Sequence, residues 1–397
     1  MNFNIIQVNE YTKPIGLENI GATCYMNAVL QCFYHVKVLT NELLKIIPQL
    51  PMISAYKDVI SQLSSNSLYS ARPINFKNVI SKNPLFRGIQ ANDSKDLILY
   101  FLETIENELT ALNYFFQNYK YINRIRNMKN VQDPALMNII NQFQNNHKSI
   151  ISDLFYGFKK QILTCKECRV KLTNYQIINL IIFPIEAVYN SKDKNKSANT
   201  SKYNEVKESY NFWYTTNQEY GKYYPSNKYY KGNNRTEIPS YLNYGGNYKS
   251  GPKKVSLYEC FDYEMIPIDF FGDNQIFCKN CNKMCDGISE NIIFSTPYIL
   301  ILILNRGKGN EFDCDVEFNE TINIRKYVES HDCPLDYNLI GVISHLGESN
   351  MSGHFIADCK HFDGKWYRFN DGIVSGPNDH YSQRGIPYVL FYQYNRI

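Results

Sequence analysis

Hydrophobic positions along the chain indicate helices in its first part. Apolar residues recur at helical spacing over residues 24–47, 53–63 and 97–109, and Pro48 ends the first segment. The third segment follows Asp93 and has acidic residues in its first turn, as expected for an amphipathic helix. Residues 112–150 are polar and give only weak helical signals. The chain therefore begins with at least three helices.

Short apolar runs replace the helical spacing after Ile151. The run from Tyr298 to Leu304 is apolar without alternation, which is typical of a strand buried on both faces of a sheet. Helices followed by strands predict an α+β fold. Strand signals resume at Val255 after an interruption, and the strands are expected at 154–158, 161–164, 175–185, 298–304, 339–344, 355–360, 365–370 and 388–394.

The interruption spans residues 187–254 and differs from the rest in composition. It has 11 Tyr between Tyr203 and Tyr248 but few Val, Ile or Leu, so it offers too little apolar area for a core. Between Asn190 and Lys254 there are 12 Lys and Arg against 5 Asp and Glu, although the whole chain carries only +4. We therefore predict a flexible inserted loop, and no nucleic-acid binding by the remaining chain. Interleaved Tyr and Lys in the loop could alternatively bind RNA or a protein partner.

A glycine-rich turn leads into the first helix, in the sequence GLENIGATCYMNAVLQCF over residues 16–33. Thr23 is suited to cap that helix, which places Cys24 in its first turn. The positive end of the helix dipole favours a thiolate there. Cys24 is therefore a candidate nucleophile, with an ordinary buried cysteine as the alternative.

Partners for this thiol occur far downstream. His354 opens one predicted strand, Asn370 and Asp371 end the next, and Asp363-Gly364 between them is a hairpin signal. A hairpin brings the start of its first strand beside the end of its second. Cys24, His354 and either Asn370 or Asp371 thus supply a nucleophile, a base and a group that orients the base.

Two boxes, residues 16–27 (GLENIGATCYMN) and 353–371 (GHF…W…FND), resemble the ubiquitin-specific protease family of papain-like cysteine peptidases. The resemblance covers nearly the whole chain apart from the insertion. It implies a papain-like α+β fold in a catalytic domain over 16–397, after a lead-in of residues 1–15. A helical thumb is expected at about 16–150, β fingers at about 151–186 and 255–295, and a palm at about 296–397.

The resemblance also implies a cysteine-type deubiquitinase, which hydrolyses the bond after the C-terminal glycine of ubiquitin. Asp93 stands in a box that departs from the family's usual Gln-Asp-Ala-x-Glu-Phe, and a plain helix cap is its other reading. The implied roles are Cys24 as nucleophile, His354 as base, Asn370 as acceptor of the Nδ1–H of His354, Asn19 in oxyanion stabilisation, Asp371 as a helper, and Asp93 and Gly353 in substrate binding.

Two CxxC pairs form a second candidate site. Cys165 and Cys168 make one pair, and Cys278 and Cys281 the other. Four such thiols are typical of a structural, tetrahedral zinc site, and the inserted loop accounts for the long gap between the pairs. Redox chemistry is the rival use of CxxC. We therefore predict one structural zinc ion per chain, with Cys260 and Cys285 near enough to replace a ligand.

The N-terminal residues lack a signal-peptide pattern, and no apolar run approaches the roughly 20 residues of a membrane span. With an odd number of 11 Cys, this favours a protein without disulfides in the cytosol or nucleus, away from membranes. A monomer is also expected. Three alternatives to a deubiquitinase remain: a catalytically weak ubiquitin-binding module, a protease for a ubiquitin-like modifier, and a general papain-like peptidase of short peptides.

Overall fold

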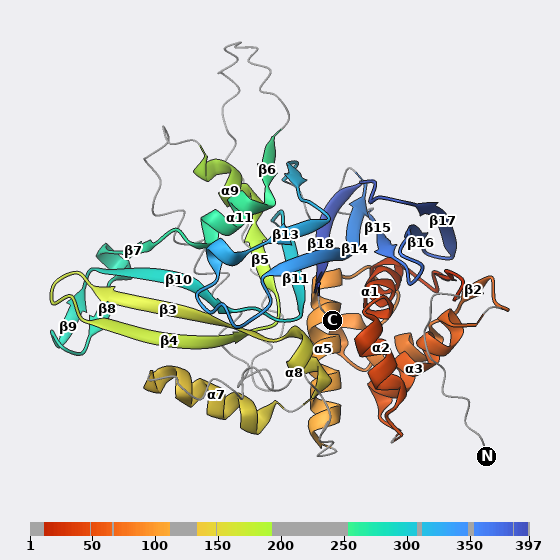
Figure 1. Ribbon diagram of the computed structural model, residues 1–397, viewed down its shortest axis with the longest axis horizontal. Helices are drawn as coiled ribbons and strands as arrows, with labels where there is room; N and C mark the ends of the chain where they lie inside the picture. The colour runs from red at the N-terminus through yellow and green to blue at the C-terminus, as the bar shows by residue number, and fades with distance from the viewer. Residues whose placement is uncertain are drawn as a thin grey trace, which may run out of the picture.

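The computed structural model describes residues 12–111, 133–192 and 253–395, apart from residues 48, 66, 148, 308–311, 348–352 and 384. Figure 1 shows helices packed against one end of a central sheet and a long β arm that projects from it. The predicted α+β class is confirmed. Most of the predicted lead-in and most of the predicted inserted loop lie outside the described residues, and the domain boundaries stay predictions. Within the described ranges, no helix has the length and apolarity required to cross a membrane.

The first helices are α1 (Cys24–Tyr34), α2 (Lys37–Leu44), α3 (Pro51–Leu63), α4 (Ile74–Ile80) and α5 (Ser94–Ala111). The expectation of one helix over 24–47 is wrong, because the chain turns between α1 and α2. Thr40 donates its hydroxyl to the carbonyl oxygens of Phe33 and Tyr34, at 3.3 and 3.0 Å, and so satisfies groups at the end of α1.

Two other elements differ from the expectation. Helix α8 (Ile150–Phe155) occupies the start of the strand predicted at 154–158, because Ser149 and Ser152 form a capping box that starts a helical turn. Helix α9 (Ile185–Ser191) occupies the start of the predicted inserted loop, where Val188 is buried. The predicted loop therefore begins too early.

The central sheet has the strand order β17-β16-β15-β14-β18-β11-β5, with β13 beside β14. Its strands are β5 (Ile181–Pro184), β11 (Ile299–Asn305), β13 (Thr321–Asn323), β14 (Asp336–Leu346), β15 (His354–Lys360), β16 (Trp366–Asn370), β17 (Ile373–Asn378) and β18 (Ile386–Tyr394). Helices cover both faces. The strand expected at 298–304 is therefore confirmed as β11, whose described residues up to Leu304 are all buried.

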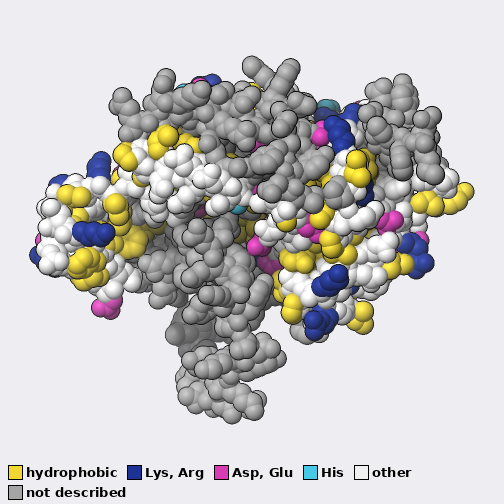
Figure 2. Space-filling model, turned by 90° about the horizontal axis from the view of Figure 1, so that it is seen from below, with side chains coloured by type: hydrophobic (Ala, Val, Ile, Leu, Met, Phe, Trp, Pro, Cys, Tyr) yellow, Lys and Arg dark blue, Asp and Glu magenta, His cyan; other side chains and the backbone are white. Residues whose placement is uncertain are grey.

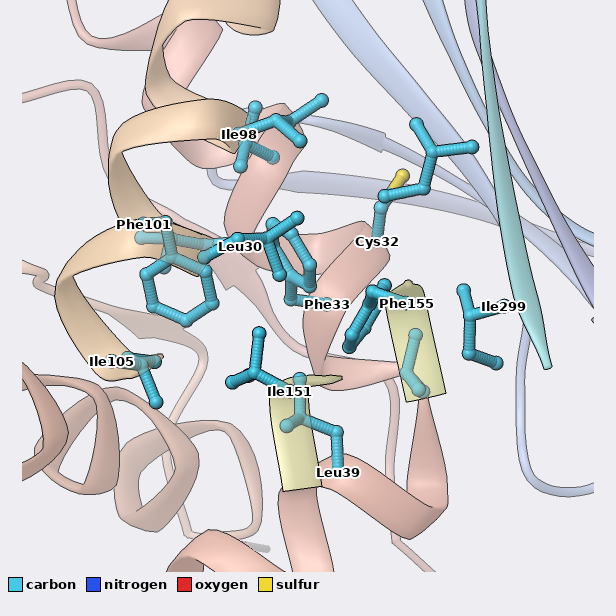
Figure 3. Close-up of a cluster of buried hydrophobic side chains, with 14 of the residues drawn as sticks. Leu30, Cys32, Phe33, Leu39, Ile98, Phe101, Ile105, Ile151, Phe155 and Ile299 are labelled. Carbon is cyan, nitrogen blue, oxygen red and sulfur yellow. The ribbon is translucent and has the colours of Figure 1, made fainter. Parts of the chain in front are cut away.

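The side chains of β11 alternate between two cores. Ile299, Ile301 and Ile303 belong to the core formed with α1, α5 and α8. Figure 3 shows Phe33, Phe101 and Phe155 in this core, with Ile299 beside them; the ring centroid of Phe33 lies 4.6 Å from that of Phe101 and 5.8 Å from that of Phe155. The intervening leucines face a second core with α9 and α11 (Leu257–Glu264). Helix α1 is thus fixed directly against the sheet.

The β arm is a four-stranded antiparallel sheet, β4-β3-β10-β7, which we call the finger sheet. Its strands are β3 (Gly157–Cys165), β4 (Lys171–Ile178), β7 (Ile268–Phe270) and β10 (Gly287–Ser295). A hairpin of β8 (Ile276–Cys278) and β9 (Lys283–Cys285) lies at its far end (Figure 1). Apolar side chains are exposed there, on the left of Figure 2; they include Val170, Leu172, Phe277 and Met284.

Smaller elements join these parts. Strand β1 (Gly16–Leu17) pairs with β2 (Ser70–Ala71), and β6 (Lys254–Ser256) pairs with β12 (Asp315–Glu317). Helix α7 (Pro134–Asn146) packs against β4. The position of β1 matters for the site, since the N–H of Leu17 donates to the carbonyl oxygen of Asp371 at 2.9 Å and holds the chain before Cys24 next to the end of β16. A Cβ on Gly16 would lie 2.5 Å from that oxygen. Only glycine fits at that position.

Candidate active site and thiol cluster

Cys24 is the first residue of α1, and its side chain is only 5% exposed. The chain enters the helix through two residues with positive φ, Gly21 at 122° and Ala22 at 47°. Thr23 stands at the N-cap position, but its hydroxyl donates to Asn19 Oδ1 and accepts from the N–H of Ile20 instead of capping the helix. The expected cap is therefore wrong. The N–H groups at the start of α1 receive no side-chain cap, so they remain directed at the thiol and the space beyond it.

The pKa of Cys24 is raised, and burial is the main cause. Hydrogen bonds from the backbone N–H groups of Phe355, Tyr25 and Cys24 itself act in the opposite direction, while the negative charge of Asp371 adds to the rise. The helix-terminus argument predicted a stabilised thiolate, and this net direction contradicts it. The thiol therefore needs a nearby base to become a nucleophile.

His354 begins β15 and provides that base by position. The antiparallel hairpin of β15 and β16 brings it beside Asn370 at the end of β16, and His354 Nε2 lies 2.6 Å from Asn370 Oδ1. The expectation that Nδ1 makes this bond is wrong. With Nε2 facing the amide oxygen, Nδ1 is the ring nitrogen left to exchange a proton with a thiol. The N–H of Phe355, next to His354, reaches the Cys24 thiol and so links the two elements.

Asp371 follows Asn370 in a left-handed conformation, with φ at 49°. Its Oδ2 lies 3.8 Å from His354 Nε2, farther than the amide of Asn370. The carboxylate instead accepts from Asn19 Nδ2 at 3.0 Å and from Asn27 Nδ2 at 2.8 Å. Asp371 is therefore bound mainly to the loop before Cys24 and to α1.

Asn19 is exposed at the mouth of the site, and its amide has a fixed orientation. Its Oδ1 accepts from the N–H groups of Thr23 and Gly21, at 3.1 and 3.2 Å, while its Nδ2 donates to Asp371. One N–H of that amide is not needed for these bonds and can point to a ligand. Sequence reasoning missed Asn27, which anchors Asp371 from α1; its signal is a buried polar residue within an apolar helix.

Asp93 and Gly353 lie at the same end of the central sheet. Asp93 Oδ1 accepts from the N–H of Lys95, so the carboxylate caps the start of α5, and both its oxygens lie 2.7 Å from the hydroxyl of Tyr388. A Cβ on Gly353 would lie 1.6 Å from His345 Nε2, so a larger residue there requires the His345 side chain to move. A substrate-binding role for either residue stays a prediction.

The two CxxC pairs come together at the far end of the finger sheet. Cys165 and Cys168 lie at the turn between β3 and β4, and Cys278 and Cys281 at the turn of the β8–β9 hairpin. Their four sulfur atoms all lie within 4.8 Å of one another, and the Cys168 and Cys278 sulfurs are 3.6 Å apart. This donor set suits a tetrahedral metal ion.

Backbone N–H groups prepare two of these thiols for metal binding. The N–H of Val170 lowers the pKa of Cys168 to about 6, and a backbone hydrogen bond from Cys168 lowers the pKa of Cys165. Of the two further cysteines suggested as substitutes, Cys285 packs with this cluster. Cys260 belongs to the second core of the central sheet instead, so its predicted substitute role is wrong.

Comparison with known proteins gives a family. Residues 15–392 match the family model described as ubiquitin carboxyl-terminal hydrolase. The chain is 25% identical over 383 residues to ubiquitin carboxyl-terminal hydrolase 10 of Saccharomyces cerevisiae, which covers 91% of this chain and 45% of that protein. It is 22% identical over 407 residues to ubiquitin carboxyl-terminal hydrolase 21 of Homo sapiens, covering 96% and 61%. The chain thus spans about half the length of these curated relatives.

Solved structures share the fold. A chain in the structure of the SAGA DUB module Ubp8/Sgf11/Sus1/Sgf73 bound to monoubiquitin matches 100% of this chain and 72% of its own length, with a TM-score of 0.62 and 19% identity. A second structure of that module, bound to ubiquitin aldehyde, gives a TM-score of 0.61. The family match over nearly all residues carries the conclusion. The chain therefore belongs to the ubiquitin carboxyl-terminal hydrolase family, the group of ubiquitin-specific proteases that its two boxes predicted.

Proposed function

We propose that this chain is a cysteine-type deubiquitinase, which hydrolyses the isopeptide or peptide bond after the C-terminal glycine of ubiquitin. The observation that carries the proposal is that a buried thiol accepts a hydrogen bond from the backbone of Phe355, the residue next to a histidine whose ring is held by Asn370. Cys24 starts α1 beside the N–H of Phe355, and His354 is held by Asn370 at 2.6 Å. Nucleophile, base and orienting group are the parts that thiol hydrolysis requires.

The proposed reaction starts with proton transfer from Cys24 to His354 Nδ1. The thiolate attacks the carbonyl carbon after the terminal glycine, and a C–S bond forms. The resulting oxyanion receives hydrogen bonds from the free N–H of Asn19 and from the backbone N–H of Cys24. His354 then protonates the departing amine as the C–N bond breaks, and the acyl-enzyme remains.

Water completes the proposed cycle. His354 accepts a proton from water, whose oxygen attacks the thioester, and the C–S bond breaks to release the carboxylate. The imidazole returns its proton to the Cys24 sulfur. Asn370 keeps the imidazole in one orientation through both steps, and Asp371 keeps Asn19 in place.

Ubiquitin is the proposed substrate because the family is described as ubiquitin carboxyl-terminal hydrolase and because two solved structures with the same fold are bound to monoubiquitin or to ubiquitin aldehyde. The test is labelling with an electrophile fused to the C-terminus of ubiquitin, in parallel with probes built on ubiquitin-like modifiers. We expect covalent labelling by the ubiquitin probe alone, and none of Cys24→Ala. Preferential labelling by the probe of another modifier would identify that modifier as the substrate instead of ubiquitin. Tight ubiquitin binding without labelling would indicate a binding module.

A structural zinc ion is proposed for the thiol cluster. The four thiols would hold it as thiolates with no open position, and its role would be to join the turn of β3 and β4 to the β8–β9 hairpin. Metal analysis of purified protein tests this, with one zinc per chain expected. We further propose that the protein is a monomer in the cytosol or nucleus, without nucleic-acid or membrane partners. Size-exclusion chromatography with light scattering tests the oligomeric state, and imaging of a tagged protein tests the location.

A further inference from the structure

Cys285 is a fifth thiol at the cluster, which the CxxC spacing does not explain. Its side chain is 0% exposed. It packs with Cys165 and Cys278, and the cluster contains no hydrophobic residue other than the five cysteines. A cysteine that serves only as a small apolar side chain packs among other apolar side chains, so these neighbours argue for a role connected with the metal.

The hairpin geometry directs Cys285 to the cluster. In the β8–β9 pair, Cys278 lies opposite Lys283 and Ile276 lies opposite Cys285, so Cys278 and Cys285 share one face. Phe277 and Met284 occupy the other face and are exposed. Cys278 and Cys285 therefore approach the metal position from the same side of one hairpin.

Cys281 is a candidate ligand that shares the β8–β9 hairpin and its turn with Cys285 and lies close to it. Their sulfur atoms and a carboxylate oxygen of Glu167 all lie within 4.8 Å of one another. Glu167 is paired with Lys283 at 2.8 Å, so its carboxylate already has a partner. Cys281 and Cys285 belong to the same hairpin and its turn, so one thiol can take the position of the other by a side-chain rotation, without moving a second element.

We propose that Cys285 is a reserve ligand, which completes a four-thiolate site with Cys165, Cys168 and Cys278 when Cys281 is lost to substitution or to oxidation by a peroxide, in which the sulfur takes one oxygen atom to give a sulfenic acid and the peroxide leaves as water or an alcohol. This inference rests on the proposed zinc ion. Cys281 is half-buried at the hairpin turn, whereas Cys285 is fully covered, so an oxidant meets Cys281 first. The reserve thiol would keep the hairpin joined to the finger sheet after such damage.

The test compares the full chain with its Cys281→Ser, Cys285→Ser and Cys281→Ser/Cys285→Ser variants, with Cys260→Ser as the matched control. Metal analysis gives the zinc stoichiometry, and competition with a chromophoric chelator gives the zinc affinity. After cobalt substitution, the sulfur-to-metal charge-transfer band reports the number of thiolate ligands. We expect Cys281→Ser and Cys285→Ser each to retain one zinc ion and a four-thiolate spectrum. The double variant should lose affinity by more than the roughly 100-fold that an outer-shell change costs.

The outcomes separate this inference from the zinc proposal. A wild-type chain without zinc overturns both. One zinc in the wild type, with Cys281→Ser as weak a binder as the double variant, overturns the reserve ligand alone. Two metal ions in the wild type also overturn it, because Cys285 would then serve a site of its own. If Cys281→Ser does not fold while Cys285→Ser does, Cys285 has failed to replace its neighbour, and the inference is wrong.

Discussion

The active site and the thiol cluster both join segments that are far apart in the chain, but they are supported in opposite ways. In the active site, Asn19 and Asp371 are 352 residues apart and meet where α1 packs on the central sheet. Its side chains rest on a large apolar core. The cluster joins two turns at the end of the β arm, and five cysteines are its whole core.

This difference predicts different consequences of substitution. Where a core already fixes the backbone, a catalytic side chain can be removed with little change in the free energy of unfolding. Where thiols and a metal replace a core, loss of a thiol that Cys285 does not replace costs structure and leaves the distant chemistry intact. The following predictions test that separation, beginning with the largest effect.

Cys24→Ala should abolish turnover, by on the order of 10⁴-fold or more, because no other group can form the acyl-enzyme. The melting temperature and ubiquitin affinity should stay close to those of the wild type. Hydrolysis of a ubiquitin–fluorophore conjugate, thermal melting and calorimetry measure the three quantities. Cys32→Ala on the same helix is the control and should keep activity. Measurable turnover by Cys24→Ala would show that Cys24 is not the nucleophile.

Asn370→Ala should reduce kcat by about 10²- to 10⁴-fold, since His354 loses its 2.6 Å partner. Asn370→Asp should retain much of the activity, because its carboxylate can accept the same bond. Asp371→Ala should reduce kcat by less, about 10- to 100-fold, because Asp371 acts by holding the amide of Asn19 in place. A double-mutant cycle checks this route: Asn19→Ala should add little to Asp371→Ala. If Asp371→Ala is the more damaging change and is additive with Asn19→Ala, Asp371 orients His354 directly.

Cys165→Ser should release the zinc ion and lower the melting temperature by several degrees, while Cys24 remains reactive. The finger sheet should become sensitive to limited proteolysis near β8 and β9, and treatment of the wild type with a strong chelator should have the same effect. Cys260→Ser, a buried cysteine outside the cluster, controls for thiol loss. Zinc-free protein with wild-type stability and protease resistance would show that the end of the arm does not depend on metal.

The sequence predicted those features of the active site and of the central sheet that depend on the geometry of neighbouring residues in the chain. A hairpin signal at Asp363-Gly364 was sufficient to place His354 near Asn370 and Asp371 without choosing between them, and the unbroken apolar run at 298–304 identified a strand covered on both faces. Two CxxC pairs indicated the thiol cluster in spite of the long separation. For the hairpin and the buried strand the local pattern is sufficient, whereas the meeting of the CxxC pairs was inferred from their chemistry as a four-thiolate donor set.

One wrong prediction comes from a local signal that was overlooked, and the others depend on contacts between distant segments. The run at 154–158 has no period that separates helix from strand, and the capping box at Ser149 decided it. The net pKa of Cys24 depends on burial by other elements, which the position at a helix start cannot report. Which nitrogen of His354 faces Asn370, and which spare cysteine joins the cluster, follow from strand register and packing, which no motif encodes.

A smaller effect concerns the pH dependence of Cys24 in the free enzyme. Because burial raises its pKa, fewer molecules carry the thiolate at neutral pH than for an ordinary cysteine. The rate of alkylation of Cys24 by iodoacetamide should therefore rise with pH through the usual thiol range and level off only above it. Peptide mapping of the labelled residue measures this, with glutathione as the reference thiol. A rate already constant below pH 7 would show a stable thiolate–imidazolium pair instead.

The smallest expected effect is replacement of residues 193–252 by a short Gly/Ser linker. Lys192 Nζ donates to the carbonyl oxygen of Lys254 at 2.8 Å and pairs with Glu259 at 2.8 Å, so the two ends of this segment lie close together. A short linker can therefore join them without moving α9 or β6, and loop-closure entropy changes only slowly with length. No residue of the active site or of the thiol cluster falls within the segment, so turnover of a ubiquitin–fluorophore conjugate and zinc content should both stay within a few-fold of the wild type.

In the linker variant, the additional substitution Lys192→Met should loosen this junction without further loss of activity. A collapse of turnover with normal melting would place part of the segment in the active site, whereas a loss of zinc would place it at the cluster.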